Sequence, residues 1–337
     1  MKINDKRISQ VHGGGGEAMN ELLSEIVKSI KNRNVKGGIG LNELDDSATI
    51  PLGKESIVFT TDSYTVKPLF FPGGDIGKLS ICGTINDLAV MGAKPIAIST
   101  AFIIGDGFLI SDLRKIMESI NKISEETNTA IVTGDTKVIE EGIELIVNTS
   151  GIGFARKIIT DSGLKEGDKI IINGTVGDHG IAILAKREGI EFETKLKSDC
   201  APLHSLIEKI LKYEIHAMKD PTRGGIANAL NEFAEKSNLG IIIDEERIPF
   251  REEVKSASEM LGIDPLTVAN EGKVLISVSE DDAEHVLKEM RKSKYGKNSE
   301  IIGEVTKENR GKVILKTIIG GKRILEKPRG DPVPRVC

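Results

Sequence analysis

The chain has 337 residues, of which 39% are hydrophobic and 29% charged, a balance typical of soluble globular proteins with room for two domains. A net charge of -5 argues against sequence-independent binding to nucleic acid. No apolar run is long enough to cross a bilayer, and the first residues lack the apolar region of a signal peptide. We therefore expect a cytoplasmic protein that binds neither membrane nor nucleic acid.

The three cysteines, Cys82, Cys200 and Cys337, are odd in number, widely spaced and without a CxxC pair. This spacing favours reduced thiols over a disulfide framework or a zinc site. Cys82 lies in an apolar helical stretch and is expected to be buried as a small hydrophobic residue. Cys200 is expected near the start of a helix.

Hydrophobic periodicity predicts alternating types of element in the first half of the chain. After a glycine run at 12–16 we expect a helix at 19–30, a strand at 57–60, a helix at 76–91, a strand at 96–104, a helix at 113–123, and strands at 130–133 and 145–154. Consecutive elements in this order look like hairpin neighbours rather than strictly alternating βαβ units. The pattern is typical of an α+β domain.

The second half repeats this mixture after a charged stretch at 154–169. Strands are expected at 169–173, 240–243, 274–278 and 312–317, and helices at 182–187, 202–213, 225–236 and 283–292. We therefore predict four regions: a glycine-rich N-terminal segment with its helix (1–37), an α+β domain for ATP binding and dimerisation (38–155), a second α+β domain (156–318) and a flexible tail (319–337).

The tail carries a thiol on its last residue, Cys337. Pro328, Pro332 and Pro334 fix φ and remove backbone donors, so an extended polyproline-like segment is expected. At about 3 Å per residue, the stretch from Gly320 spans on the order of 50 Å. A cysteine at a frayed end can be incidental, and the prenylation motif does not fit because it places cysteine four residues from the end.

Four acidic loops occur in the first half, around Asp45 and Asp46, Asp62, Asp87 and Asp135. Clustered carboxylates without histidine or cysteine are hard oxygen ligands, suited to Mg²⁺ shared with nucleotide phosphates. A single aspartate of this kind is as readily a helix or turn cap. Four together favour a metal site, with their side chains converging on one edge of a sheet.

A second anion-binding pattern runs from Lys219 through Asp220 to Gly225 and opens directly into a helix. The free N–H groups of Gly224 and Gly225, the helix dipole and Arg223 suit phosphate. The segment 73–79 imitates a P-loop but is one residue short and has Leu79 where Ser or Thr is needed. No GxGxxG fingerprint opens a first βα unit.

Two residues are candidates for proton transfer. Lys137 follows Asp135 by two residues, and Glu271 lies between Asn270 and Gly272 before a strand. Lys137 could equally form an ion pair with Asp135, and Glu271 could equally lie in a solvent-exposed turn.

Together these motifs resemble the aminoimidazole ribonucleotide synthetase (PurM)-like superfamily of ATP-dependent enzymes, which includes selenophosphate synthetase and thiamine monophosphate kinase. Within it, the chain resembles over its whole length the HypE family of hydrogenase maturation factors. The motifs that carry the resemblance are 12–16, 45–48, 86–95, 134–138, 177–180, 219–225, 270–272 and the terminal Pro-Arg-Val-Cys at 334–337. The acidic and glycine-rich loops indicate the superfamily, and the terminus indicates the family.

The resemblance implies a two-domain PurM-like α+β fold that uses ATP and Mg²⁺. It implies that the carbamoyltransferase HypF loads the terminal thiol. The loaded group is then dehydrated to a thiocyanate, and the cyano group passes to iron on a HypC–HypD complex. It also implies a homodimer joined through the N-terminal domains, whose sheets pair across the two-fold axis.

Site residues follow from the same resemblance. The catalytic residues would be Cys337, Glu271 and Lys137, with Glu271 as the base. Nucleotide contacts would come from Asn86, Asp87, Gly134, Asp135, Thr222, Arg223, Gly224, Gly225 and Asn270. Metal ligands would be Asp45, Asp46, Asp62, Asp87 and Asp220.

Two alternatives stay open. One is a small-molecule kinase or synthetase of the same superfamily, although selenophosphate synthesis is disfavoured because no cysteine lies near the N-terminal glycine loop. The other is a non-catalytic, ATP-gated carrier that presents a modified Cys337. The acidic loops argue against the carrier, because presenting a thiol needs no phosphate-binding machinery.

Overall fold

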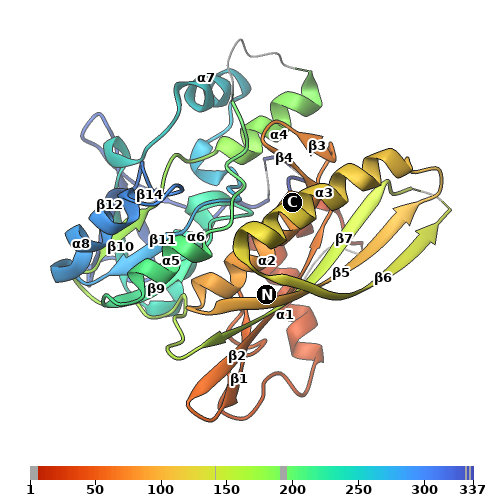
Figure 1. The fold of residues 1–337 in the computed structure, drawn as a ribbon. Helices are drawn as coiled ribbons and strands as arrows, with labels where there is room; N and C mark the ends of the chain where they lie inside the picture. Colours follow the sequence, from red (N-terminus) through yellow and green to blue (C-terminus); the bar gives the residue numbers. More distant parts are fainter. Residues whose placement is uncertain (1–6, 141, 190–195, 331, 334) are drawn as a thin grey trace.

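The computed structural model describes residues 7–140, 142–189, 196–330, 332–333 and 335–337. Two β-sheets, each with its own helices, lie on either side of the central helix α2 (Ile76–Val90) (Figure 1). The first sheet has the strand order β1-β2-β7-β5-β6. Its strands are β1 (Ala48–Leu52), β2 (Glu55–Tyr64), β7 (Leu145–Ala155), β5 (Lys94–Gly105) and β6 (Ala130–Ile139).

Helices α2 and α3 (Ile110–Thr127) pack against each other and against this sheet. The amphipathic α3 buries Ile116, Ile120 and Ile123 and connects the parallel pair β5 and β6. By contrast, α2 is buried around nearly its whole circumference. This follows from its position, because the first sheet covers one side of the helix and the second domain covers the other.

The second sheet has seven strands in the order β14-β13-β10-β12-β8-β11-β9. They are β8 (Lys169–Ile172), β9 (Ile215–Lys219), β10 (Gly240–Asp244), β11 (Leu275–Val278), β12 (Glu300–Thr306), β13 (Val313–Lys316) and β14 (Lys322–Leu325). Ile170 and Ile172 point toward α6 (Gly225–Ser237), whereas Ile171 points toward α5 (His204–Ile210) and α8 (Glu280–Arg291). Both faces are covered, which explains the continuous apolar runs of these strands.

The remaining elements surround the junction between the domains. They are α1 (Gly16–Ser29), α4 (Asp178–Glu188), α7 (Glu252–Leu261), a small hairpin of β3 (Phe70–Phe71) and β4 (Gly74–Asp75), and the 3₁₀ turns η1 (Gln10–Gly13), η2 (Glu245–Arg247) and η3 (Pro265–Thr267). In the part of the chain that the structure describes, no helix has the length and apolar character needed to cross a membrane.

The α+β fold and every helix and strand expected from periodicity are confirmed, with shifts of a few residues at their ends. Strands β1, β9, β12 and β14 and helix α7 were not predicted. Segment 73–79 is the β4–α2 junction, where Asp75 caps the helix by accepting from the Lys78 N–H at 3.0 Å. This geometry agrees with its rejection as a P-loop.

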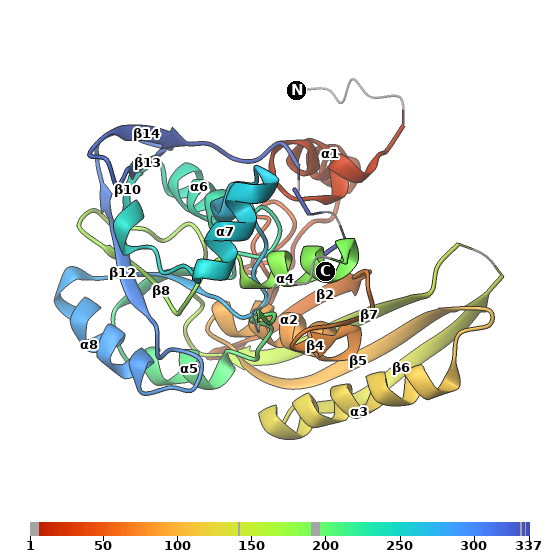
Figure 2. The same cartoon turned by 90° about the horizontal axis from the view of Figure 1, so that it is seen from above.

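The expectation of a free arm from residue 319 is not confirmed. Residues 322–325 form β14, which pairs with β13, and the side chains of Val333 and Val336 are buried in the core of the first domain. Figure 2 shows the final segment running from β14 toward α1 and ending beside α4. Pro334, one of the three tail prolines, lies outside the described residues.

Asn86, predicted as a nucleotide contact, instead joins the two domains. From α2 its amide donates to the Ala201 carbonyl at 3.1 Å and accepts from the Leu203 N–H at 2.8 Å. The side chain is 1% exposed. Both sides of its amide are therefore occupied by protein.

We predict that Asn86→Ala lowers the free energy of unfolding by about 1–3 kcal/mol, because a buried backbone N–H loses its acceptor. Urea unfolding measures this, with the exposed Asn121→Ala on α3 as control. Unchanged stability combined with weaker nucleotide binding would restore the original role of Asn86.

Candidate active site

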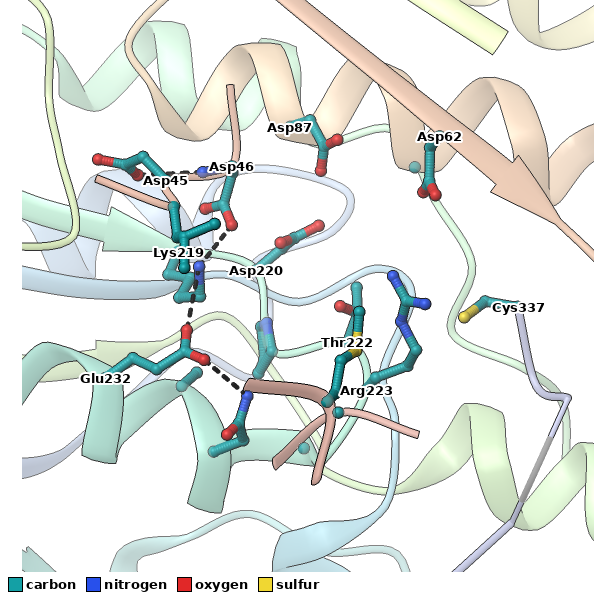
Figure 3. A pocket seen from close by; sticks show the side chains of 18 of the residues that line it. Asp45, Asp46, Asp62, Asp87, Lys219, Asp220, Thr222, Arg223, Glu232 and Cys337 are labelled. Atoms are coloured by element: carbon teal, nitrogen blue, oxygen red, sulfur yellow. Dashed lines mark hydrogen bonds and ion pairs between the residues drawn. The ribbon is translucent and has the colours of Figure 1, made fainter. Parts of the chain in front are cut away.

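A cavity of about 360 Å³ lies between the two domains and α1. Its walls come from the loop before β1, from β2 and α2 of the first domain, and from the β9–α6 connection of the second (Figure 3). The last residue of the chain, Cys337, also lines it. The cavity therefore depends on the relative placement of both domains.

Five carboxylates predicted as metal ligands line this cavity: Asp45, Asp46, Asp62, Asp87 and Asp220. They come from four separate segments, and Figure 3 shows the side chains of the last three turned toward a common space. The prediction that these loops converge is confirmed for this group.

Burial and the proximity of other acids raise the pKa values of several of these carboxyl groups. Burial, together with repulsion from neighbouring carboxylates, raises the pKa of Asp45 to about 7 and that of Asp220 to about 8. Burial and the charges of Asp220, Asp62 and Asp46 also raise the pKa of Asp87 well above its usual range. The cavity thus holds more negative charge than its own cations neutralise.

Lys219 supplies the main internal compensation. Its ammonium lies 2.5 Å from Asp46, 3.3 Å from Glu232 and 3.5 Å from Asp161. These carboxylates hold the pKa of Lys219 well above its usual range despite its burial. The other oxygen of Asp46, Oδ2, is buried without a hydrogen-bond partner.

These residues fit a divalent cation in chemistry, although they do not form a finished cage. All the donors are hard oxygens, burial and neighbouring carboxylates raise the pKa values of Asp45, Asp87 and Asp220, and Asp46 Oδ2 has no partner. Among the described residues, however, no three acidic, histidine or cysteine side chains converge closely enough to hold an ion. Phosphate oxygens would have to complete the coordination.

The β9–α6 connection provides the predicted anion-binding end of the cavity. Thr222, Arg223 and Gly225 line it, and Gly224 caps the N-terminus of α6 in the left-handed region, with φ of +77°. The negative charge at Cys337 is the largest cause that raises the pKa of Arg223. Arg223 and the terminal residue therefore interact electrostatically across the cavity.

The N-terminal glycine run closes the same side. A Cβ on Gly15 would lie 2.8 Å from the Arg223 carbonyl oxygen, and one on Gly16 would overlap the Pro328 carbonyl. Both have positive φ, so the requirement for glycine is both conformational and steric. These glycines let α1 approach the phosphate-type loop and the tail together.

Glu271 is the one predicted proton-transfer residue that reaches the cavity. It is 3% exposed, and its Oε1 atom has no hydrogen-bond partner. Burial, with the nearby Cys200, Asp220 and Asp199, raises its pKa well above the usual range. An unpaired carboxyl group of raised pKa at a cavity wall suits general acid–base catalysis.

Gly134, Asp135 and Lys137 do not reach this cavity within one chain. They lie on the edge strand β6, where Lys137 and Asp135 form an exposed ion pair at 2.7 Å that lowers the pKa of Asp135. The expectation that all four acidic loops meet is therefore wrong for this loop in a single chain.

Strand register gives the reason. Asp62 pairs with Thr149, which bonds to Thr84 of α2, so Asp62 lies on the helix-covered face. Asp135 is level with Asn148, the neighbour of Thr149 on β7, and lies on the opposite face. Alternation of side chains along a strand separates the two carboxylates.

Asn270 supports the cavity from behind. Its side chain accepts from the Gly177 N–H at 2.8 Å and donates to the Pro221 carbonyl at 3.0 Å. It is fully buried and does not line the cavity. Asn270 therefore supports the loop at 221–225. It does not reach the cavity, where its predicted contact with the nucleotide would have to lie.

Sequence reasoning gave no individual role to three polar residues of the site, although Lys219 opens the predicted anion-binding pattern. Thr60 donates to Asp87 at 2.8 Å, Lys219 neutralises Asp46, and Glu232 follows Gly225 by seven residues on α6. The seven-residue spacing places Glu232 on the same face of the helix as its N-terminal loop. That spacing was the available signal for Glu232.

Comparison with known proteins agrees with this geometry. Residues 44–155 match the N-terminal domain, and residues 165–316 the C-terminal domain, of the AIR synthase related proteins. A putative hydrogenase expression/formation protein of Methanocaldococcus jannaschii is 55% identical over 98% of this chain and 100% of its own. Carbamoyl dehydratase HypE of Cupriavidus necator is 41% identical over 100% and 97%, respectively.

Solved structures show the same relationship. The chain is similar to a crystal structure of a HypE–HypF complex, with TM-score 0.84, 44% identity and coverage of 93% of this chain and 100% of that one. It is also similar to HypE in complex with ATP, with TM-score 0.82, 36% identity and coverage of 98% and 100%. The chain therefore belongs to the HypE family of hydrogenase maturation carbamoyl dehydratases, within the AIR synthase related proteins.

Proposed function

We propose that this chain is an ATP-dependent dehydratase that converts an S-carbamoyl group on its own Cys337 into a thiocyanate. One observation carries the proposal: the terminal cysteine lines the same cavity as the unpaired carboxyl group of Glu271, the acidic cluster and the phosphate-type loop. A group on that sulfur would lie among residues suited to phosphoryl transfer and to proton removal. The relatives named carbamoyl dehydratase support the same reaction.

The reaction requires activation because the carboxamide oxygen is a poor leaving group. Attack of that oxygen on the γ-phosphate of ATP forms an O–P bond and releases ADP. Loss of both N–H protons then breaks the C–O bond, expels inorganic phosphate and leaves C≡N on sulfur. The water formally lost from the carboxamide is accounted for by the hydrolysis of ATP to ADP and phosphate.

Glu271 is the proposed base for those protons. Its raised pKa gives it substantial affinity for a proton, and burial keeps competing water away. Arg223, which is close to Cys337, Asp62 and Glu271, provides positive charge for the transferring phosphoryl group.

Asp46, Asp62, Asp87 and Asp220 are the proposed ligands of Mg²⁺. When bound, the ion would neutralise charge on the phosphoryl oxygens. ATP binding is supported by the family member solved with ATP. The unpaired oxygen of Asp46 and the raised pKa values of Asp87 and Asp220 support a cation among them.

The terminal thiol must also meet other proteins. We propose a HypF-type carbamoyltransferase as the donor, as the family's HypE–HypF complex suggests, and a HypC–HypD complex as acceptor of the cyano group for hydrogenase iron. A tethered thiol reaches each site at high effective concentration without tight binding. The docked tail is the arrangement suited to the dehydration step.

A homodimer would bring the remaining predicted residues into use. The open face of the first sheet carries Ile50, Phe59, Ile152 and Phe154, each at least 37% exposed. Asp135 lies on this same open face. An exposed apolar sheet face of this kind suits a symmetric partner. Lys137 and Asp135 would then serve the cavity of the second copy.

The central test is intact-protein mass spectrometry. After incubation with the transferase, carbamoyl phosphate and ATP, Cys337 should gain a carbamoyl group, which fresh Mg²⁺·ATP should convert by loss of one water. Glu271→Gln should retain the carbamoyl mass, with dehydration slowed about 100-fold or more, because the base is lost. Cys337→Ser should gain no carbamoyl group and should therefore show no loss of water.

Other outcomes of that test would reject the proposal. A wild-type adduct that never loses water would indicate the carrier function. No adduct, with a transferase proven active on another substrate, would indicate a small-molecule kinase.

Stability of the metal-free protein should fall as pH rises from about 4 to about 8, the range between the unfolded and folded pKa values of Asp45 and Asp220. The raised pKa values of Asp45 and Asp220 mean that the folded chain holds protons which the unfolded chain releases above its ordinary pKa near 3.8. Each such group lowers the free energy of unfolding by up to about 1.4 kcal/mol per pH unit within this window. Urea unfolding with a chelator measures the slope.

Mg²⁺ should reduce that loss, because it replaces the missing positive charge. Asp220→Asn should flatten the slope without the metal, whereas the exposed Asp281→Asn on α8 should leave it unchanged. A pH-independent stability in wild type would show that the acids do not repel one another as proposed.

Mixed dimers test the second copy. Glu271→Gln and Lys137→Ala should each be inactive as homodimers. If each site combines Glu271 of one subunit with Lys137 of the other, a dimer of the two variants has one intact site and one site in which both residues are altered. Random exchange should therefore restore about a quarter of wild-type activity. If each site used its own Lys137, mixing would restore none.

A further inference from the structure

The Gly177–Gly180 motif, which the dehydration chemistry does not use, places a histidine against the tail. His179 lies in the first turn of α4, is fully buried and stacks edge-on to Phe71 at 5.6 Å. Its Nε2 atom is 2.7 Å from the carbonyl oxygen of Val336, the residue before the terminal cysteine.

The surrounding hydrogen bonds define the proton on this ring. A carbonyl oxygen only accepts, so Nε2 must carry hydrogen and donate to Val336. Nδ1 lies 2.8 Å from Ser198 Oγ, which itself accepts from the Cys200 N–H at 3.0 Å. The Ser198 hydroxyl hydrogen is thus available for Nδ1. Burial lowers the pKa of His179, which keeps this neutral form.

Other elements bind the backbone oxygens on either side. The Arg335 carbonyl accepts from the Lys67 N–H at 3.1 Å and from Arg187 Nη2 at 3.0 Å. A terminal carboxylate oxygen of Cys337 accepts from Thr65 Oγ1 at 3.2 Å. The carbonyls of Arg335 and Val336 and the terminal carboxylate are therefore bound by the protein body, which fixes the direction of the last residue.

Val336 supplies a buried apolar side chain, and the Arg335 side chain adds a polar contact because its Nε donates to the Thr65 carbonyl at 3.1 Å. Val336 is 1% exposed and packs in the core of the first domain, whereas Arg335 is exposed and adopts a positive φ of 58°. A turn at Arg335 thus directs Val336 inward and leaves Cys337 at the cavity.

We propose that His179, oriented by Ser198, is the positioning residue that docks the tail and presents Cys337 to the dehydration site, with Val336 as the side chain that the dock selects. The catalytic purpose of this docking rests on the proposed function. The docking itself does not rest on the proposed function, because it requires no carbamoyl group, ATP or partner.

Release of Cys337 by carboxypeptidase Y from the full-length protein tests this proposal. The protease needs an undocked terminus, so its rate follows the undocked population. Intact-mass measurement should show release about tenfold faster in His179→Leu, which keeps the bulk but loses the donor. His179→Gln keeps an N–H donor and should stay within about threefold of wild type. His285→Leu, exposed on α8, is the matched control and should not change the rate.

A wild-type rate in His179→Leu would overturn the proposal. Equal acceleration in the Gln and Leu variants would also overturn it, because it would indicate loss of core packing. Histidine ¹⁵N resonances in the wild-type protein give a measurement that does not depend on the folding of the Leu variant: His179 should carry its proton on Nε2, and an Nδ1–H form would contradict the dock.

A functional readout separates this idea from the reaction itself. Single-turnover dehydration of the carbamoylated protein should slow about tenfold in His179→Leu and recover in His179→Gln. If carboxypeptidase results follow expectation but wild type never dehydrates its carbamoyl group, the proposed function fails and the dock stands. Normal dehydration in a His179→Leu variant with an undocked tail would reject the positioning role.

Discussion

Repulsion among carboxylates buried between two domains is the constraint on which this structure depends. Neither domain alone assembles the cavity: Asp46, Asp62 and Asp87 come from the first, and Asp220 with its neighbour Lys219 comes from the second. Lys219 offsets part of the charge across the interface, and α2 holds the domains in register through its buried surface. Ligand binding and domain arrangement are coupled because any cation or phosphate-bound metal at this position stabilises the same interface.

The tail uses a different principle from the acidic cluster. Its docking depends on hydrogen bonds to the backbone oxygens of the last three residues, one from the Arg335 side chain to the Thr65 carbonyl, and the buried side chains of Val333 and Val336. A modified cysteine can occupy the cavity with the same anchors. In the proposed reaction, these contacts away from the sulfur atom would hold the same last residues whether Cys337 carries a free thiol, a carbamoyl group or a cyano group.

The sequence predicted the fold class and most of the site because acidic loops, glycines and the terminal motif are local signals. Asp62 could be assigned from the end of a predicted strand and Asp220 from the resemblance, but the outward direction of Asp135 depends on the register of β5, β6 and β7. The Lys219–Glu232 contact joins the end of β9 to the second turn of α6, and the docking of Val336 joins residues that are far apart in the chain. Such contacts are consequences of tertiary packing, which periodicity does not encode.

The energetics of docking suit a tail that must also leave. Burying two valine side chains contributes about 3–6 kcal/mol, and five hydrogen bonds that involve Arg335, Val336 and Cys337 contribute about 2.5–7.5 kcal/mol. Ordering six backbone residues costs about 6–12 kcal/mol. These terms nearly cancel, so docked and undocked tails differ little in free energy. A ligand at the cavity or a partner at the exposed Arg335 would then need only a modest binding difference to decide where the thiol resides.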